Sequence, residues 1–127
     1  MDELFKALSF KDGLIPAIIV DDEGGEVLTL CYMNEEALRA TLQSGQVHVF
    51  RRSKGRVMLK GETSGHTQSV REVRIDCAGN SLLIRVLQKA AACHTGYKTC
   101  YYRRYDAKSD ALQATGRPVF NPDDVYK

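Results

Sequence analysis

The sequence predicts an α+β fold with mostly antiparallel strands and one or two helices. Two short runs rich in β-branched residues, 15–20 and 27–33, flank the acidic, glycine-containing segment 21–25, and this pattern is typical of a β-hairpin. Residues 35–43 combine a helical apolar spacing with recognisable end signals. The 127 residues are enough for one domain, 1–127, with its own hydrophobic core.

The helix is predicted to begin after Asn34, because an asparagine side chain readily accepts a hydrogen bond from an amide of the first turn. Acidic residues follow in the first turn, where they interact favourably with the helix dipole. Gly45 lies just past the predicted end, where a residue with a left-handed backbone is common. One apolar face is formed by Ala37, Leu38 and Leu42.

Two further strands are predicted at 47–50 and 57–60, on either side of the polar segment 51–56. Basic residues gather here, and clustered cations suit the phosphates of a small ligand as well as a polynucleotide backbone. A solvated strand edge explains the charge alone equally well. The formal net charge of +2 does not demand nucleic acid as a partner. The cluster contains Arg51, Arg52, Lys54, Arg56 and Lys60.

The next predicted strand, 73–77, alternates apolar with charged residues. This parity predicts that Cys77 points inward and that Asp76 points the other way. The turn 78–81 then leads into an apolar strand at 82–87.

The remaining segments carry weaker signals. Glycine and threonine interrupt residues 90–100 too often for a strand or helix to be assigned. The tail from Tyr105 onward is polar and contains Gly116, Pro118 and Pro122, so it is predicted to pack as an irregular strap.

The chain is expected to work in the cytoplasm, without a membrane partner. Its N-terminus is acidic and has no long apolar core, so it does not resemble a secretory signal. The longest uncharged apolar run, 13–20, is far shorter than the roughly 18 residues of a membrane span. In a reducing compartment the four cysteines are expected to be thiols or metal ligands rather than disulfides.

Three of these cysteines, Cys77, Cys93 and Cys100, are candidate zinc ligands. A catalytic zinc takes three protein ligands and leaves a fourth place for water. Their spacing matches no common zinc finger, and buried core thiols are the competing interpretation, one that fits Cys31 well. His94 follows a candidate ligand directly and is interpreted either as a base for a metal-bound water or as a hydrogen-bonded loop histidine.

Several segments occur in an order that single spacings do not explain. Together they resemble the phosphoribosyl-AMP cyclohydrolase family of histidine biosynthesis, and the resemblance runs from about Gly13 to Arg104. The segments are 13–17, 32–37, 60–68, 93–96 and 100–103.

The resemblance implies an intertwined homodimer with zinc at the subunit interface. Cys77 of one chain would meet Cys93 and Cys100 of the other, with His94 beside them. Zinc in such a site lowers the pKa of its water enough to provide hydroxide near neutral pH. Attack on C6 of the N1-substituted adenine of 1-(5-phosphoribosyl)-AMP and cleavage of the N1–C6 bond would then open the ring.

The same resemblance suggests how a phosphorylated purine nucleotide is bound. The substrate has two phosphates on two riboses, and Arg51, Ser53 and Lys60 are the phosphate candidates. Polar contacts to ribose or purine are expected from Glu62, Thr63 and Ser64.

One segment departs from the family. Relatives usually carry Asp-Cys-Asp-x-Asp, whose three carboxylates serve a magnesium ion, whereas this chain keeps Asp76 but has Ala78 and Asn80 in the other two places. Magnesium prefers hard oxygen ligands, so Asp76 with Asn80, water and a substrate phosphate would bind it more weakly. Two alternatives therefore stay open: a paralogous zinc hydrolase acting on another purine-like nucleotide, and a non-catalytic, zinc-stapled dimer that binds nucleotide.

Overall fold

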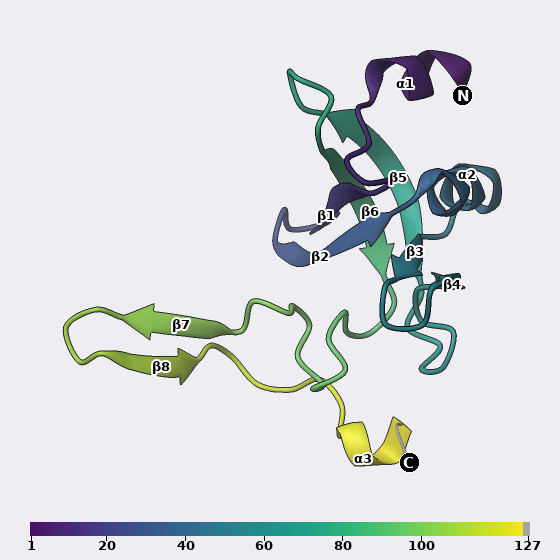
Figure 1. Ribbon diagram of the computed structural model, residues 1–127. Helices are drawn as coiled ribbons and strands as arrows, with labels where there is room; N and C mark the ends of the chain where they lie inside the picture. Colours follow the sequence, from purple (N-terminus) through teal and green to yellow (C-terminus); the bar gives the residue numbers. More distant parts are fainter. Residues whose placement is uncertain (126–127) are drawn as a thin grey trace.

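The structure, a computed structural model, describes residues 1–125, and its centre is a four-stranded sheet with the order β2-β1-β6-β5 (Figure 1). β1 pairs with β2, and β5 with β6, in antiparallel hairpins, whereas β1 and β6 lie parallel. The sheet thus joins two hairpins that are far apart in the sequence. The predicted α+β fold with mostly antiparallel strands is confirmed. The four strands are β1 (Ile15–Asp21), β2 (Val27–Met33), β5 (Gln68–Ile75) and β6 (Leu82–Gln88).

The helix α2 (Glu35–Ser44) lies where the sequence predicted a helix and is one residue longer. The Asn34 side chain accepts a hydrogen bond of 2.8 Å from the amide of Ala37, and Gly45 ends the helix with φ 77°. At the last turn, the buried Thr41 hydroxyl accepts a 2.9 Å bond from the His48 amide. This bond ties the end of α2 to the strand that follows.

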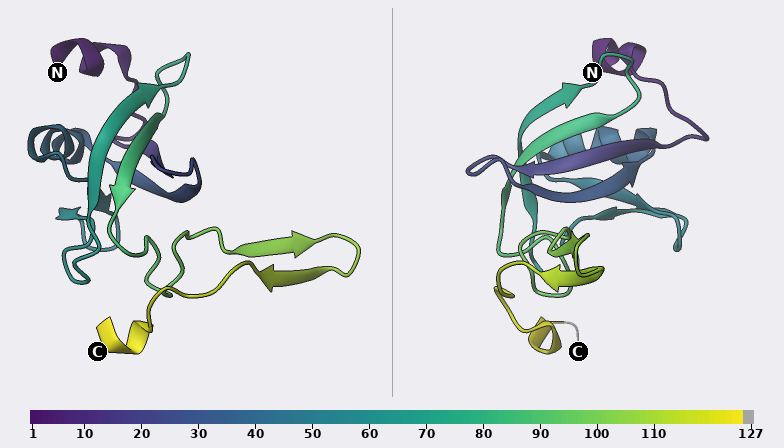
Figure 2. Two further views of the ribbon diagram at one scale, coloured as in Figure 1. Left: turned by 180° about the vertical axis from the view of Figure 1, so that it is seen from behind. Right: turned by 90° about the vertical axis from the view of Figure 1, so that its left-hand side faces the viewer.

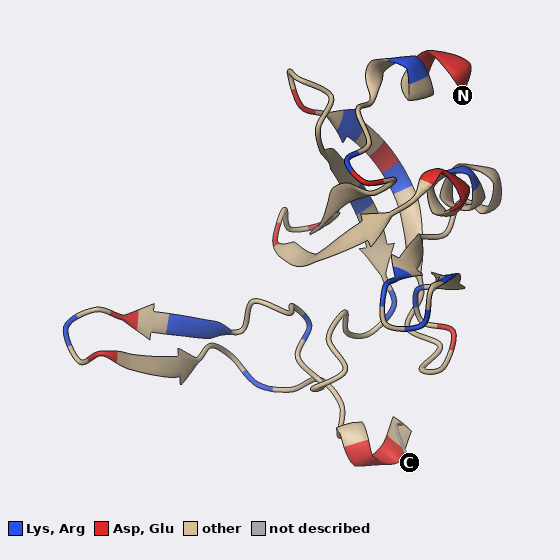
Figure 3. Cartoon of the chain, viewed as in Figure 1, with Lys and Arg blue, Asp and Glu red and all other residues tan. Residues whose placement is uncertain are grey.

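A second, two-stranded sheet is formed by β3 (His48–Arg51) and β4 (Arg56–Leu59). Both strands were predicted to within a residue or two. The Val47 amide bonds to the Gln68 carbonyl at 3.0 Å and joins this small sheet to the start of β5. Between β3 and β4, residues 52–55 form an exposed turn that carries Arg52 and Lys54 of the basic cluster, with Arg51 and Arg56 at the adjoining strand ends (Figure 3).

The hydrophobic core lies between the four-stranded sheet, α2 and β3. In β6 every second side chain is fully buried, as expected for a strand with one face on the core. Burying such side chains contributes about 1.5–3 kcal/mol each. The largest fully buried apolar side chains are Ile15, Ile19, Leu28, Met33, Leu38, Val47, Leu82, Ile84 and Val86.

A short N-terminal helix, α1 (Asp2–Ala7), was not predicted. The segment after it lies beside the turn that joins β5 to β6, where the Ser9 amide donates 2.8 Å to the Gly79 carbonyl. A Cβ atom at Gly79 would collide with the carbonyl oxygen of Ala7. A six-residue helix is held by such contacts rather than by its own propensity, so its sequence signal is weak.

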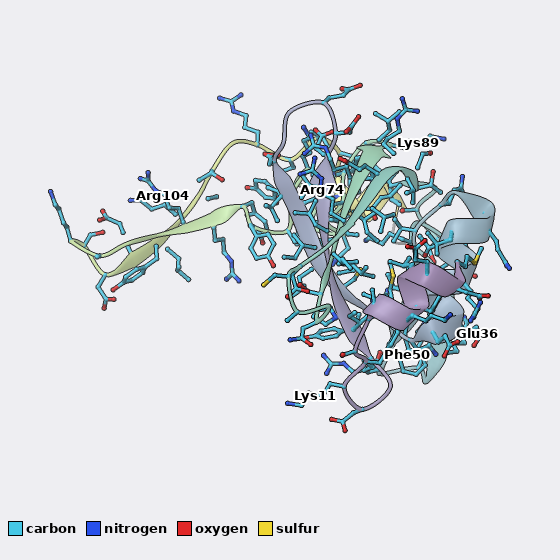
Figure 4. All side chains as sticks on the ribbon, turned by 90° about the horizontal axis from the view of Figure 1, so that it is seen from above. Lys11, Glu36, Phe50, Arg74, Lys89 and Arg104 are labelled. Carbon is cyan, nitrogen blue, oxygen red and sulfur yellow. The ribbon has the colours of Figure 1, made fainter. Side chains whose placement is uncertain are left out.

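The prediction of an irregular strap from Tyr105 onward is wrong for two stretches. β7 (Arg103–Asp106) and β8 (Ala111–Ala114) form a hairpin, and α3 (Pro122–Val125) ends the described chain. The hairpin projects from the body (Figure 2), and Arg104 lies partway along it (Figure 4). β8 was missed because its alanines and glutamine have low strand propensity. The last two residues of the predicted strap and domain, Tyr126 and Lys127, lie outside the described residues.

None of the helices within residues 1–125 is long and apolar enough to cross a membrane.

Candidate active site

A cavity of about 900 Å³ opens between β2, the β3–β4 hairpin and the loops that follow β4 and β6. It contains most of the predicted site residues, although they come from distant parts of the sequence. Two clusters meet there: the thiols after β6 on one side and the basic and hydroxyl residues around β3 and β4 on the other. The predicted residues that line it are Arg51, Ser53, Lys60, Glu62, Thr63, Ser64, Cys93, His94 and Cys100.

Cys93 and Cys100 belong to one loop, residues 91–100, which we call the cysteine loop. The Cys93 amide bonds to the Tyr97 carbonyl at 3.3 Å, and the Cys100 amide bonds to the Leu28 carbonyl of β2 at 2.7 Å. The Cys100 thiol lies within hydrogen-bonding reach of the Cys93 thiol and the Thr29 hydroxyl. The loop therefore presents two adjacent sulfur ligands to the cavity.

Each of the two sulfurs has a hydroxyl group beside it. Burial raises the pKa of Cys100, the Thr29 hydroxyl lowers it, and the neighbouring Cys93 raises it again. The Thr95 hydroxyl donates a 2.9 Å hydrogen bond to the Cys93 sulfur, which fixes the position of that sulfur in the loop. Thr95 was not among the predicted site residues. It lies two residues after Cys93 in an irregular loop, and the sequence does not show which side chains of such a loop come into contact.

Cys77 lies elsewhere, in the turn that joins β5 to β6. The prediction that it points inward is wrong, because β5 ends at Ile75 and Cys77 is exposed. β6 separates this turn from the cysteine loop, and its seven residues span about 20 Å. The two regions lie at opposite ends of the β5–β6 hairpin (Figure 1).

Of the three predicted zinc ligands, one chain brings two to the cavity and leaves the third outside it. Cys93 and Cys100 offer two soft ligands side by side, and the exposed Cys77 is accessible to a second copy of the chain. Within the described part of a single chain, no three His, Cys, Asp or Glu side chains converge as a metal site. The donor chemistry is thus suitable for zinc, with the third ligand absent from the cavity of a single chain.

The predicted magnesium ligands do not fit that ion. One carboxylate oxygen of Asp76 accepts hydrogen bonds from the amides of Asn80 at 2.6 Å and Ser81 at 3.1 Å. It therefore holds the turn closed. Ala78 provides no side-chain oxygen, and Asn80 provides only a neutral one. A single carboxylate with one of its two oxygens already engaged is a poor site for a divalent cation.

The basic side of the cavity is the β3–β4 hairpin. Arg51 and Ser53 are exposed on it and line the cavity. The Arg52 guanidinium, which was not predicted to be part of the site, stacks 4.5 Å from the centre of the Tyr32 ring, and both residues also line the cavity. The sequence shows a cluster of basic residues but does not indicate which of them stacks on an aromatic ring.

The hydroxyl residues Thr63 and Ser64 lie on a tight loop after β4. Gly61 has φ 88°, and a Cβ atom there would come within 2.6 Å of the His66 carbonyl group. The Gly65 amide closes the loop with a 2.8 Å bond to the Gly61 carbonyl. Gly61 is thus required by its backbone conformation and by the close approach of His66.

The sequence analysis placed Cys31 in the hydrophobic core and outside the site. In the structure it lies at the boundary between the core and the cavity. Its side chain packs against the core but also lines the cavity, and its thiol donates to the Ala17 carbonyl at 3.7 Å. Burial raises the pKa of Cys31 to about 12, although the nearby Lys60 ammonium acts in the opposite direction. It is a protonated thiol near neutral pH.

An ion pair between the half-exposed Lys98 and the buried carboxylate of Asp21 fixes the cysteine loop to the sheet. The Lys98 ammonium lies 2.6 Å from the carboxylate of Asp21 at the end of β1, whose side chain is only 7% exposed. The hydrogen bond from Lys98 lowers the pKa of Asp21 below 3.8, and the same bond raises the pKa of Lys98 above 10.5. This pair was not predicted, because its two residues are far apart in the sequence.

Replacing Asp21 by asparagine is expected to lower the free energy of unfolding by about 1 kcal/mol near pH 7, since Lys98 is partly solvated. Because folding lowers the pKa of Asp21, the ionised carboxylate stabilises the folded state at pH values above 3.8, the pKa of the unfolded chain. The stability difference between wild type and variant should therefore vanish as the pH falls below 3.8 and Asp21 becomes protonated. It should also shrink above the raised pKa of Lys98. Urea unfolding across this pH range measures both changes. Glu26→Gln is the control, because Glu26 lies 4.0 Å from Lys98; equal effects of the two variants would contradict the assignment.

Comparison with known proteins gives one consistent result. The family model of phosphoribosyl-AMP cyclohydrolase matches residues 29–102. The chain is 47% identical over 127 residues to the phosphoribosyl-AMP cyclohydrolase of Salinibacter ruber, covering 99% of this chain and 98% of the relative. It is 50% identical over 118 residues to the one from Methanocella arvoryzae, covering 93% and 95% of the two chains. For Desulforapulum autotrophicum the values are 52% over 116 residues, with 91% and 92% covered.

Proposed function

Since the chain belongs to the phosphoribosyl-AMP cyclohydrolase family, whose members are hydrolases of histidine biosynthesis, we propose that it opens the adenine ring of 1-(5-phosphoribosyl)-AMP by hydrolysis of the N1–C6 bond. The observation that carries this proposal is the cavity, in which two sulfur ligands face a basic and hydroxyl-rich wall. Such a cavity combines a metal position with groups that bind phosphate and ribose. We assign the protein to the cytoplasm, where its thiols stay reduced.

The zinc ligands in this proposal are Cys93 and Cys100 of one chain and Cys77 of a second. The separation of Cys77 from the cavity supports an intertwined homodimer, because the third ligand has to come from outside the chain. A zinc ion held by three protein ligands supplies a bound water that ionises near neutral pH.

The chain's own residues then bind the substrate and move the proton. We assign His94, which lines the cavity next to Cys93, as the base that accepts a proton from the attacking water. Arg51 and Ser53 are assigned to phosphate. The Glu62 carboxylate and the hydroxyls of Thr63 and Ser64 are assigned to ribose or purine. The substituent on N1 makes the ring cationic, so C6 is electrophilic before any residue acts on it.

The test is a ring-opening assay with the purified, zinc-loaded protein and 1-(5-phosphoribosyl)-AMP. Formation of the opened imidazole carboxamide is expected without added magnesium, because the turn that holds Asp76 does not suit that ion. Absence of product with zinc fully loaded, with and without excess magnesium, would refute the proposed reaction. Turnover of another purine nucleotide alone would point to a paralogous hydrolase.

The double variant Ala78→Asp with Asn80→Asp tests the turn itself. Two added carboxylates beside Asp76 should strengthen magnesium binding by about tenfold or more. Calorimetric titration of wild-type and variant protein with magnesium measures the change. If the wild-type chain already binds magnesium as tightly as the variant, the turn is not the altered site.

A further inference from the structure

Lys60 differs from Arg51 and Arg52 on the cavity wall because its ammonium group donates a hydrogen bond to the backbone of another segment. It follows directly after β4, and its amide bonds to the Val47 carbonyl at 2.9 Å, so its backbone is fixed. Its side chain is half-buried and lines the cavity with Cys31, Cys93 and Cys100. Arg51, by contrast, is exposed on the β3–β4 hairpin.

The partner of Lys60 belongs to the cysteine loop. Its Nζ donates a 2.9 Å hydrogen bond to the carbonyl of Ala92, the residue before Cys93. Ala92 is 3% exposed, and its amide bonds to the Lys98 carbonyl at 2.9 Å, across the base of the loop. The Lys60 bond therefore links the end of β4 to the backbone that carries Cys93.

Within residues 1–125, Lys60 forms no ion pair. No Asp or Glu of this range lies within 4 Å of its Nζ, whereas Lys98 of the cysteine loop is paired with Asp21. The thiols that share the cavity wall with Lys60 are those of Cys31, Cys93 and Cys100. Three thiolates around a divalent cation leave a net negative charge, and a half-buried ammonium beside them offsets it.

We propose that Lys60 is a positioning residue for the zinc ligands, holding Cys93 through the Ala92 carbonyl and compensating the thiolate charge, rather than a ligand for substrate phosphate. The role rests on the proposed zinc site. It makes Lys60 an outer partner of the metal, and loss of such a partner typically weakens metal binding by about 10–100-fold.

The experiment measures transfer of zinc from the full-length holoprotein to a chromophoric chelator. Lys60→Met should lower zinc affinity about tenfold or more, because it removes both the hydrogen bond and the charge. Lys60→Gln keeps a donor for the Ala92 carbonyl without the charge, so it should lie between Met and wild type. Lys89→Met replaces an exposed lysine that does not line the cavity, and it should match wild type.

Steady-state kinetics at saturating zinc separates this role from phosphate binding. The positioning role predicts a KM for phosphoribosyl-AMP within about threefold of wild type and a lower kcat. Wild-type zinc affinity with a KM raised tenfold or more, in either Lys60 variant, would overturn the proposal. The zinc-transfer assay needs no substrate, so it tests the role of Lys60 independently of the proposed reaction. Zinc binding that depends on Lys60, in a protein without cyclohydrolase turnover, would refute the proposed function and support the role of Lys60. If Lys60→Met does not fold, as judged by circular dichroism, the Gln variant decides.

Discussion

Replacing Cys93 by alanine is expected to lower turnover of phosphoribosyl-AMP by about a thousandfold or more, since a catalytic metal contributes several kcal/mol to the reaction. Cys77→Ala should be equally inactive, although Cys77 lies on a turn far from the cavity of its own chain. Zinc content and ring-opening rate measure both variants. Cys31→Ala removes a thiol that is not an assigned ligand, and it should retain zinc.

Mixing the two inactive variants tests the shared site directly. In a dimer of one Cys93→Ala chain and one Cys77→Ala chain, both missing ligands belong to the same zinc site. The other site keeps all three of its cysteines. An equal mixture after subunit exchange should regain about a quarter of the wild-type activity, as expected for two equivalent sites related by a twofold axis. No recovery, with exchange verified by differently tagged chains, would show that the ligands come from a single chain.

Replacing Gly61 by alanine is expected to lower the free energy of unfolding by about 2–4 kcal/mol and to raise KM about tenfold. The positive φ costs about 1–2 kcal/mol, and the new Cβ would press on the His66 carbonyl group, which adds an overpacking term. Relief of that contact displaces Glu62, Thr63 and Ser64 from the cavity wall. Urea unfolding and substrate-dependent rates measure the two effects.

Gly65→Ala is the matched control in the same loop. Gly65 has φ 76°, but a Cβ atom there meets nothing within 4 Å, so this variant carries the backbone cost alone. It should lose about 1 kcal/mol of stability and change KM little. If both variants behaved alike, the approach of Gly61 to His66 would not be what shapes the substrate loop.

Local chemistry explains which parts of the fold the sequence predicted. The cap at Asn34, the glycine at position 45 and the apolar strand β6 are set by neighbours within a few residues, and all three appear as expected. α1 and the β7–β8 hairpin were missed because they are short and have weak intrinsic propensity. Both ends of β5 were misplaced, since the predicted strand was 73–77 and β5 is Gln68–Ile75. A period-two pattern does not show where a strand begins or gives way to a turn.

The same distinction holds for the site. Residue types and order identified nine residues that the structure places around one cavity. Contacts across the fold gave no such signal: Lys60 with Ala92, and Asp21 with Lys98, each join segments that only the folded chain brings together. Cys77 is the opposite case, since the sequence predicts it as a zinc ligand while the structure places it on an exposed turn away from the cavity.

The parallel pairing of β1 with β6 has a consequence for how the molecule forms. Ala17 lies opposite Leu82, so this contact closes a loop of more than sixty residues, whereas each hairpin closes a short one. Long-range pairing raises the contact order and slows folding, because chain entropy is lost before the pairing stabilises anything. We therefore expect the two hairpins to form first and their docking to limit the rate. The cysteine loop bonds to β2 but follows β6, so we expect the proposed zinc ligands Cys93 and Cys100 to reach their final positions only after that slow step.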